Sequence, residues 1–151
     1  MDNFSTFALS FENIAKCINK IKSTTISEFG IKAAHFDCMV HIDMSAEGLT
    51  PTEISKDCGV DKAFVSRTTA DLIKGGFIQT NQKFNDGRKY RNKYVLTEKG
   101  REVIKETKAM IEKYFADLND RISEYEMSCF MRVILAISES ATKKKSDCEN
   151  N

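Results

Sequence analysis

Hydrophobic positions along this chain repeat mainly with the spacing of α-helices. From residue 4 to 23, apolar side chains recur at alternating steps of three and four residues, which predicts a helix with a narrow apolar seam. The seam consists of Phe4, Phe7, Phe11, Ile14, Ile18 and Ile21. A seam of this kind suits packing against a partner helix or against the protein's own core, and the pattern alone leaves both possibilities open.

Three more helices are expected before residue 75. The second covers about 32–44. A capping box at Thr50–Glu53, with Pro at the first helical position, starts a short third helix that Gly59 ends. Asp61 is a suitable cap for a fourth helix over 62–74. The buried face expected for this fourth helix consists of Val65, Thr69, Leu72 and Ile73.

Two β-prone runs follow, at 77–80 and 93–96, and the Asp86-Gly87 pair between them is a strong hairpin signal. A long helix is then expected over about 98–118. A second capping box at Ser123 starts a last helix that reaches about residue 140 and is apolar on nearly every side, so it needs more than one partner surface. The order of elements indicates a mainly α (α+β) fold.

Composition narrows the class of protein further. The chain has 151 residues, the size of one domain, and its single Pro and seven Gly favour long helices. Five Cys without a CxxC pair fit the reducing cytoplasm, and no apolar run is long enough for a membrane span. Because no nucleophile motif, phosphate loop or metal signature is present, we expect no enzyme, no cofactor and no metal site.

Charge is unevenly distributed along the chain. The whole chain carries +1, but residues 50–97 hold nine basic and five acidic side chains, a net charge of +4. The rest of the chain therefore carries −3. A basic middle between acidic flanks is typical of a polyanion-binding centre, although solvated lysines alone also explain it.

The third and fourth helices, joined by a Gly-containing turn, form a helix-turn-helix whose second helix can enter the major groove of DNA. Arg67 can donate two hydrogen bonds to guanine, or pair with Asp71 on its own helix. Phe64 can touch a thymine methyl group or serve as a core aromatic. The candidate base- and phosphate-contacting residues are Lys62, Ala63, Phe64, Ser66 and Arg67.

The hairpin supplies a second set of basic residues, Arg88, Lys89 and Arg91. A basic tip on a narrow β-ribbon can enter the minor groove, where arginine is drawn to negative potential. The alternative is a solvated loop that binds nothing. A helix-turn-helix followed at once by a basic hairpin is a winged helix.

From Gly30 to Gly100 the chain resembles the multiple-antibiotic-resistance regulator (MarR) family. The residues that carry this resemblance lie in every element of the winged helix and in both flanks of the hairpin. They are Gly30-Ile31, Leu49-Thr50, Glu53-Ile54, Gly59-Val60, Val65-Ser66-Arg67, Leu72, Gly76-Phe77-Ile78, Asp86, Arg88 and Leu96-Thr97-Glu98-Lys99-Gly100. Two features depart from the family pattern, namely a hairpin about two residues longer and Phe64 in place of a small polar residue.

The resemblance implies a homodimer that binds a pseudo-palindromic operator in double-stranded DNA. It implies a repressor released by a small aromatic effector. The expected regions are an N-terminal dimerisation helix (1–29), a winged helix-turn-helix (30–97), C-terminal dimerisation helices (98–141) and a disordered tail (142–151). The expected interface residues are Phe4, Phe7, Phe11, Ile14, Ile18, Phe130, Ile134 and Ile137.

Two other functions stay open. One is a winged-helix module that binds protein rather than DNA, although such a module has no need of a basic hairpin. The other is a thiol-based redox regulator, for which Cys17 is the candidate because Lys16 and Lys20 could lower its pKa. The alternative for Cys17 is a buried, inert thiol. His35 and His41 are expected to be polar residues of the second helix and not metal ligands.

Overall fold

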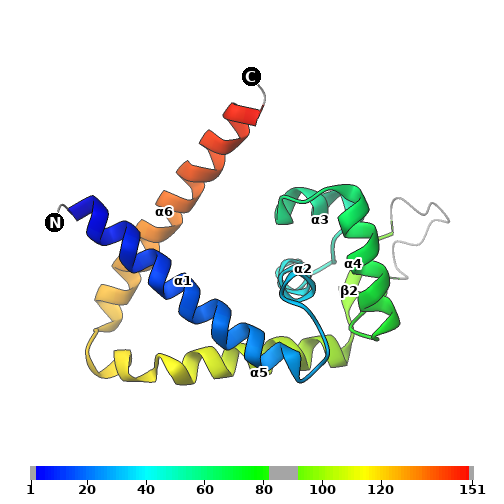
Figure 1. The fold of residues 1–151 in the computed structure, drawn as a ribbon, viewed down its shortest axis with the longest axis horizontal. Coiled ribbons are helices and arrows are strands. Elements are labelled where there is room, and N and C mark those ends of the chain that lie inside the picture. Colours follow the sequence, from blue (N-terminus) through cyan, green and yellow to red (C-terminus); the bar gives the residue numbers. More distant parts are fainter. Residues whose placement is uncertain (1–2, 82–91, 150–151) are drawn as a thin grey trace. The chain divides into compact units, whose positions relative to one another are not determined.

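The computed structural model describes residues 3–81 and 92–149, in which six α-helices and a two-stranded sheet are present (Figure 1). The elements are α1 (Asn3–Ser27), α2 (Ala33–Asp43), α3 (Pro51–Cys58), α4 (Lys62–Lys74), β1 (Ile78–Thr80), β2 (Tyr94–Leu96), α5 (Glu98–Tyr114), the 3-10 helix η2 (Ala116–Asp120) and α6 (Glu124–Glu149). The order of elements predicted from the pattern is confirmed. The chain divides into two compact units, Met1–Glu112 and Lys113–Asn151.

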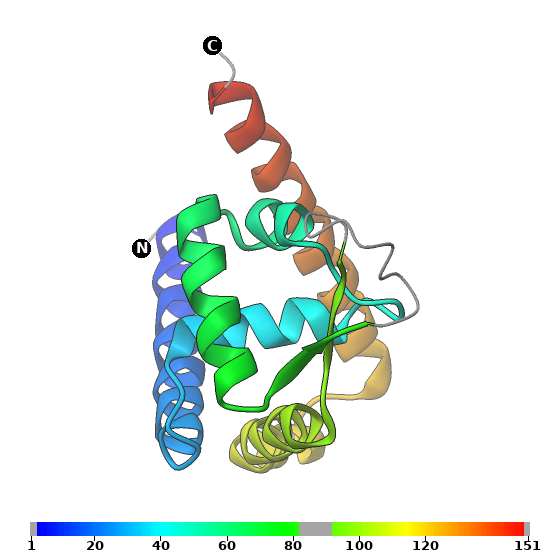
Figure 2. The same ribbon diagram turned by 90° about the vertical axis from the view of Figure 1, so that its right-hand side faces the viewer.

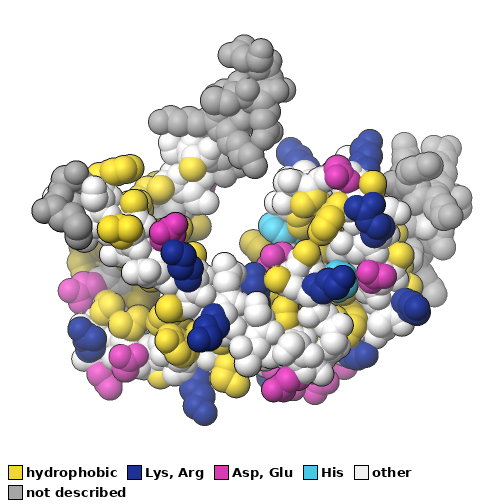
Figure 3. Space-filling view, in the orientation of Figure 1, with side chains coloured by type: hydrophobic (Ala, Val, Ile, Leu, Met, Phe, Trp, Pro, Cys, Tyr) yellow, Lys and Arg dark blue, Asp and Glu magenta, His cyan; other side chains and the backbone are white. Residues whose placement is uncertain are grey.

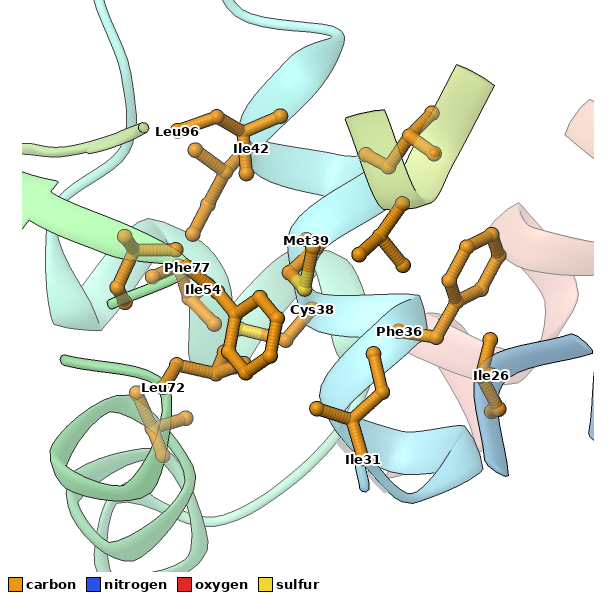
Figure 4. Packing of buried hydrophobic residues seen from close by; sticks show 14 residues of the cluster. Ile26, Ile31, Phe36, Cys38, Met39, Ile42, Ile54, Leu72, Phe77 and Leu96 are labelled. Atoms are coloured by element: carbon orange, nitrogen blue, oxygen red, sulfur yellow. The ribbon is translucent and has the colours of Figure 1, made fainter. Parts of the chain in front are cut away.

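The core of the first unit is built around α2. Phe36, Cys38, Met39 and Ile42 from this helix are all buried (Figure 4). Helices α3 and α4 pack on α2 and on each other, and β2 also contacts α2 (Figure 2). The remaining buried hydrophobic residues of this core are Ile26, Ile31, Ile54, Val65, Leu72, Phe77, Ile78, Leu96, Val103 and Ile104. Full burial of a large aliphatic side chain contributes roughly 1.5–3 kcal/mol, so this cluster is the main source of stability for the unit.

The hairpin is held to the helices by a close backbone approach. Strands β1 and β2 pair antiparallel, with Ile78 opposite Leu96, and Leu49 forms an additional bridge with Tyr94. Gly48 precedes this bridge with a φ of 81°, and a Cβ built there would lie 2.1 Å from the Tyr94 carbonyl oxygen. Only glycine fits this position, because the backbone is left-handed and the neighbour is another backbone.

Two details of the helices differ from the prediction. Ile73 is exposed, and Thr68 is buried instead, because Thr68 completes the i, i+3, i+4, i+7 stripe of α4 with Val65, Thr69 and Leu72. Helix α5 ends at Tyr114, earlier than expected, and continues into η2, which covers the predicted break.

The second unit contains η2 and α6. Ser123 caps α6 through a reciprocal box: its backbone N–H and its hydroxyl donate to Glu126 Oε2 at 2.9 and 2.7 Å. Both hydrogen bonds lower the pKa of Glu126, and the bond from the Ser123 hydroxyl has the larger effect. Disorder is predicted for residues 142–151, but helix α6 extends to Glu149. Residues 141–149 contain no Pro or Gly that would end the helix earlier. None of the described helices is long and apolar enough to cross a membrane.

Candidate nucleic-acid interface

The helix-turn-helix begins with a fully formed capping box at the start of α3. The Thr50 backbone N–H donates to Glu53 Oε2 at 2.7 Å, and the Thr50 hydroxyl accepts from the Glu53 backbone N–H at 3.3 Å. Hydrogen bonds from the backbone N–H and the hydroxyl of Thr50 both lower the pKa of Glu53, and the backbone bond has the larger effect. These contacts satisfy exposed donors at the helix start and fix the direction in which α3 leaves the preceding loop.

The turn between α3 and α4 uses a left-handed glycine. Gly59 ends α3 with φ 64° and ψ 36°, and the Ser55 hydroxyl donates to the Val60 carbonyl oxygen inside the turn. Two residues later, Asp61 caps α4 by accepting from the Phe64 backbone N–H at 2.7 Å. The turn and the cap together fix the angle between the two helices, so they determine what α4 presents to solvent.

Helix α4 has a buried face and an exposed face. Val65, Thr68, Thr69 and Leu72 anchor it in the core. The hydroxyl of Thr69 donates to the Val65 carbonyl oxygen, so this buried polar group is satisfied. The exposed residues of its N-terminal half are four of the five candidates for base contact, namely Lys62, Ala63, Ser66 and Arg67.

The fifth candidate, Phe64, is half-buried and lines a small cavity between α2, α3 and α4. Its ring therefore packs partly in the core, which agrees with the core-aromatic role, one of the two roles predicted for Phe64. The part left exposed belongs to the same N-terminal half of the helix as the other four candidates.

Arg67 and Asp71 do not pair with each other within the described part of the chain. Asp71 Oδ2 lies 3.5 Å from His35 Nε2, which ties α4 to α2. The other ring nitrogen of His35 accepts from the Lys32 backbone N–H at 3.4 Å, so its imidazole bridges the start of α2 and the middle of α4. This tie was not predicted, because the two side chains are far apart in the sequence and nothing local signals their contact.

The C-terminal end of α4 is capped by a lysine from α5. Lys99 Nζ donates to the Gly75 carbonyl oxygen at 2.8 Å and lies 4.3 Å from the centre of the Phe77 ring. A positive charge at this end of the helix is favourable because unpaired carbonyl groups point there. Several Lys and Arg side chains stand among hydrophobic and acidic side chains over the region of α3 and α4 (Figure 3).

The base of the hairpin is ordered by contacts to the loop after α2. Lys93 Nζ pairs with Glu47 at 2.9 Å, the Asn81 side chain donates to the Glu47 carbonyl oxygen at 3.0 Å, and the Asn81 backbone N–H donates to the Lys93 carbonyl oxygen. The candidate minor-groove residues Arg88, Lys89 and Arg91 lie outside the described residues. The structure therefore places the strands of the predicted hairpin and not its basic residues.

The candidate dimer residues of α1 are largely exposed. Phe4 is 78% exposed and Phe7 is 43% exposed; Phe11 and Ile14 are exposed as well, and Ile18 is half-buried. The Phe7 and Phe11 rings stack with 5.9 Å between their centres. The buried residues of α1 are Thr25 and Ile26, at its C-terminal end. The first two-thirds of α1 thus presents an apolar seam without a partner in its own unit.

Helix α6 also presents its candidates to solvent. Phe130 and Ile137 are exposed and Ile134 is half-buried. Met127, Met131 and Leu135 on the same helix are exposed as well. Exposed apolar area of this extent is typical of an interface with another chain.

Cys17 is exposed, so the alternative of a buried, inert thiol is wrong for the single chain. The reason is that the N-terminal part of α1 has no core to enter. The neighbouring Lys16 pairs with Glu12 at 3.4 Å, so its charge is shared with a carboxylate. Among the residues that the structure describes, no group of three or more His, Cys, Asp or Glu side chains could hold a metal ion.

Comparison with known proteins gives a family match and a set of similar folds. Residues 29–89 match the sequence model of the MarR family. No curated protein matches the chain. Among solved structures, Staphylococcus aureus MarR in complex with salicylate and kanamycin is 22% identical, with a TM-score of 0.74 over 92% of each chain.

Two structures of MepR mutants are also similar. One, from a multidrug-resistant S. aureus clinical isolate, is 16% identical, with a TM-score of 0.77 over 89% of this chain and 96% of that one. The other, an S. aureus mutant bound to an oligodeoxyribonucleotide, is 15% identical, with a TM-score of 0.62 over 89% and 97%. These likenesses confirm the predicted fold class, a mainly helical winged helix-turn-helix with flanking helices.

Proposed function

Because residues 29–89 match the sequence model of the MarR family, we propose that the chain acts as a homodimeric, sequence-specific DNA-binding repressor. Each subunit would place the N-terminal half of α4 in a major groove and the tip of its hairpin in the adjacent minor groove. Two subunits related by a two-fold axis would read half-sites about one helical turn apart, ~10 bp, in a pseudo-palindromic operator.

The observation that carries this proposal is the exposed surface of α4. Lys62, Ala63, Ser66 and Arg67 are exposed at one end of a helix whose opposite face is fixed in the core. Arg67 makes no salt bridge with any described residue, so its guanidinium is available to a base edge. A bidentate contact from arginine to guanine contributes about 1–3 kcal/mol of discrimination at one base pair. That a MepR mutant was solved with an oligodeoxyribonucleotide bound supports a DNA-binding role for this fold.

The test compares three single-charge deletions. Arg67→Ala should weaken binding to the operator by about 1–3 kcal/mol per half-site and relax the preference at one base position. Lys105→Ala removes the same charge from an exposed position on α5 and should bind like the wild type. Arg88→Ala should weaken binding to all sequences evenly, because minor-groove and phosphate contacts carry little sequence information. Equal binding by all three variants would contradict the docking surface.

The dimer is supported by the apolar seams of α1 and α6. Two exposed seams on helices at opposite ends of the chain suit an interface in which the helices of two subunits interleave. The residues we assign to it are Phe4, Phe7, Phe11, Ile14, Ile18, Phe130, Ile134 and Ile137.

Release by a small aromatic molecule completes the proposal. It is supported by the salicylate in the S. aureus MarR structure and by p-coumaroyl-CoA in the CouR structure from Rhodococcus jostii, a further fold match. Aromatic carboxylates added to the protein–DNA complex should lower its fluorescence anisotropy. Redox release is the alternative that the exposed Cys17 favours, and it predicts release by peroxide that Cys17→Ser abolishes.

A further inference from the structure

Two thiols from different helices line one small cavity inside the first unit. Cys38 comes from α2, and Cys58 is the last residue of α3. The cavity has a volume of about 90 Å³ and lies between α2, α3 and α4. Most of its remaining wall is apolar, with Ile54 and Val60 beside the thiols and Phe64 from α4. Cys38 is buried and Cys58 is partly exposed, so a small solute can enter from the side of Cys58.

Both thiols are protonated at neutral pH. Burial, together with the smaller effect of negative charge on Cys58, raises the pKa of Cys38 to about 12. Burial also raises the pKa of Cys58, as do the carboxylates of Asp57 and Asp37. Because the thiolate is the nucleophile in disulfide exchange and alkylation, both reactions are slow at such a pair. Because the two sulfur atoms line the same cavity, a solute that binds two sulfurs at once is the better match.

The number of ligands limits which metal ion could bind. Structural zinc requires four ligands, and among the described residues no group of three or more His, Cys, Asp or Glu could hold a metal ion. Asp37 also lines the cavity, but its carboxylate pairs with Lys22 Nζ at 2.7 Å. The cavity therefore offers two sulfur ligands and no other free side-chain donor of these four types among the described residues.

The net charge of the complex decides which soft, two-coordinate metal ion suits the cavity. Two thiolates with a divalent ion form a neutral unit, whereas two thiolates with a monovalent ion leave one negative charge. Burying an unpaired charge in an apolar cavity is costly, and the C-terminal end of α3 is unfavourable for negative charge. A soft divalent ion that binds two sulfurs in a line meets all of these conditions.

We propose that Cys38 and Cys58 form a two-coordinate site for a soft, thiophilic divalent metal ion, of which Hg²⁺ is the type. On binding, two S–H bonds break, two metal–sulfur bonds form and two protons pass to solvent, with no change in oxidation state. The ion bridges α2 and the end of α3, so it stabilises the folded unit. The site does not depend on the DNA-binding function.

The experiment uses the full chain with Cys17, Cys129 and Cys148 replaced by Ser, so that Cys38 and Cys58 are the only thiols. Hg²⁺ alone is the probe, added in the presence of an excess of a monothiol competitor and followed by mercury–thiolate absorbance in the ultraviolet. We expect one ion per chain and an increase in the temperature of unfolding. Cys58→Ser, a nearly isosteric change at a partly exposed position, should lower the apparent affinity about 100-fold or more, since chelation by two linked groups is lost.

Cys38→Ala provides the second arm and should give the same loss. Unfolding curves recorded without Hg²⁺ show that each variant is folded before the titration. The assignment is overturned if Cys58→Ser binds Hg²⁺ as tightly as its parent, or if the parent takes up two ions per chain. It is also overturned if both thiols disappear into a disulfide in aerated, metal-free protein.

Discussion

Replacing Phe7 with Ala should break the proposed dimer without unfolding the subunit. Phe7 lies in the exposed seam of α1, is 43% exposed and stacks on Phe11. A phenylalanine buries roughly 200 Å² when fully covered, so an interface over Phe7 removes about 90 Å² from water. At about 25 cal/mol per Å² this is about 2 kcal/mol per subunit.

A symmetric dimer contains the side chain twice, so the loss doubles to about 4 kcal/mol. That loss corresponds to roughly a thousandfold increase in the dimer dissociation constant. Sedimentation velocity over a dilution series measures this constant directly. Met44→Ala is the matched control, because Met44 is 80% exposed but lies outside α1 and α6.

We expect Met44→Ala to dimerise like the wild type and Phe7→Ala to dissociate at concentrations where the wild type stays dimeric. Circular dichroism of Phe7→Ala should show unchanged helix content, since Phe7 belongs to no buried cluster of the first unit. A Phe7→Ala protein with the wild-type dissociation constant would refute the assignment of this seam to the interface.

Three other changes test the fold and the site. Gly100→Ala should destabilise the protein by about 2 kcal/mol or more in urea unfolding, because a Cβ there would lie 2.2 Å from the Phe77 carbonyl oxygen; wild-type stability would contradict this packing. Glu53→Gln should lose less thermal stability on acidification than the wild type. The pKa of Glu53 is lower in the folded protein than in the unfolded chain, so its ionised carboxylate stabilises the fold above the unfolded pKa of about 4.3, and this stabilisation is lost as the pH falls through the folded pKa. Identical profiles of thermal stability against pH for the two proteins would argue against this. Cys17→Ser should leave DNA binding unchanged in the absence of oxidant, because Cys17 lies outside the helix-turn-helix; weaker binding would show that Cys17 has a structural role.

The parts of the fold that depend on local chemistry could be predicted from the sequence. Thr50 and Asp61 fixed the starts of α3 and α4, since a capping side chain bonds to the backbone only two or three residues away. The Gly59 turn and the strand pairing of 77–80 with 93–96 were also predictable, since turn residues and β-prone runs act over short distances.

Features set by long-range packing were less predictable. The His35–Asp71 contact joins α2 to α4 through the folded core, and no sequence spacing encodes it. Hydrophobicity favoured Ile73 for the buried face of α4, whereas the stripe that packs on α2 and α3 passes through Thr68. The exposure of Cys17 followed from the lack of a partner for the N-terminal part of α1 within its unit.

The central claim is that this protein binds its own operator through α4 and the hairpin. The most direct test is the fluorescence anisotropy of the purified protein on the DNA upstream of its own gene, beside a shuffled duplex, across a salt series. We predict tight binding to the upstream DNA alone, with about a thousandfold loss of affinity between roughly 50 and 200 mM salt if about six phosphates are contacted. Equal, weak binding to both duplexes would contradict the claim and favour a winged-helix module that binds protein.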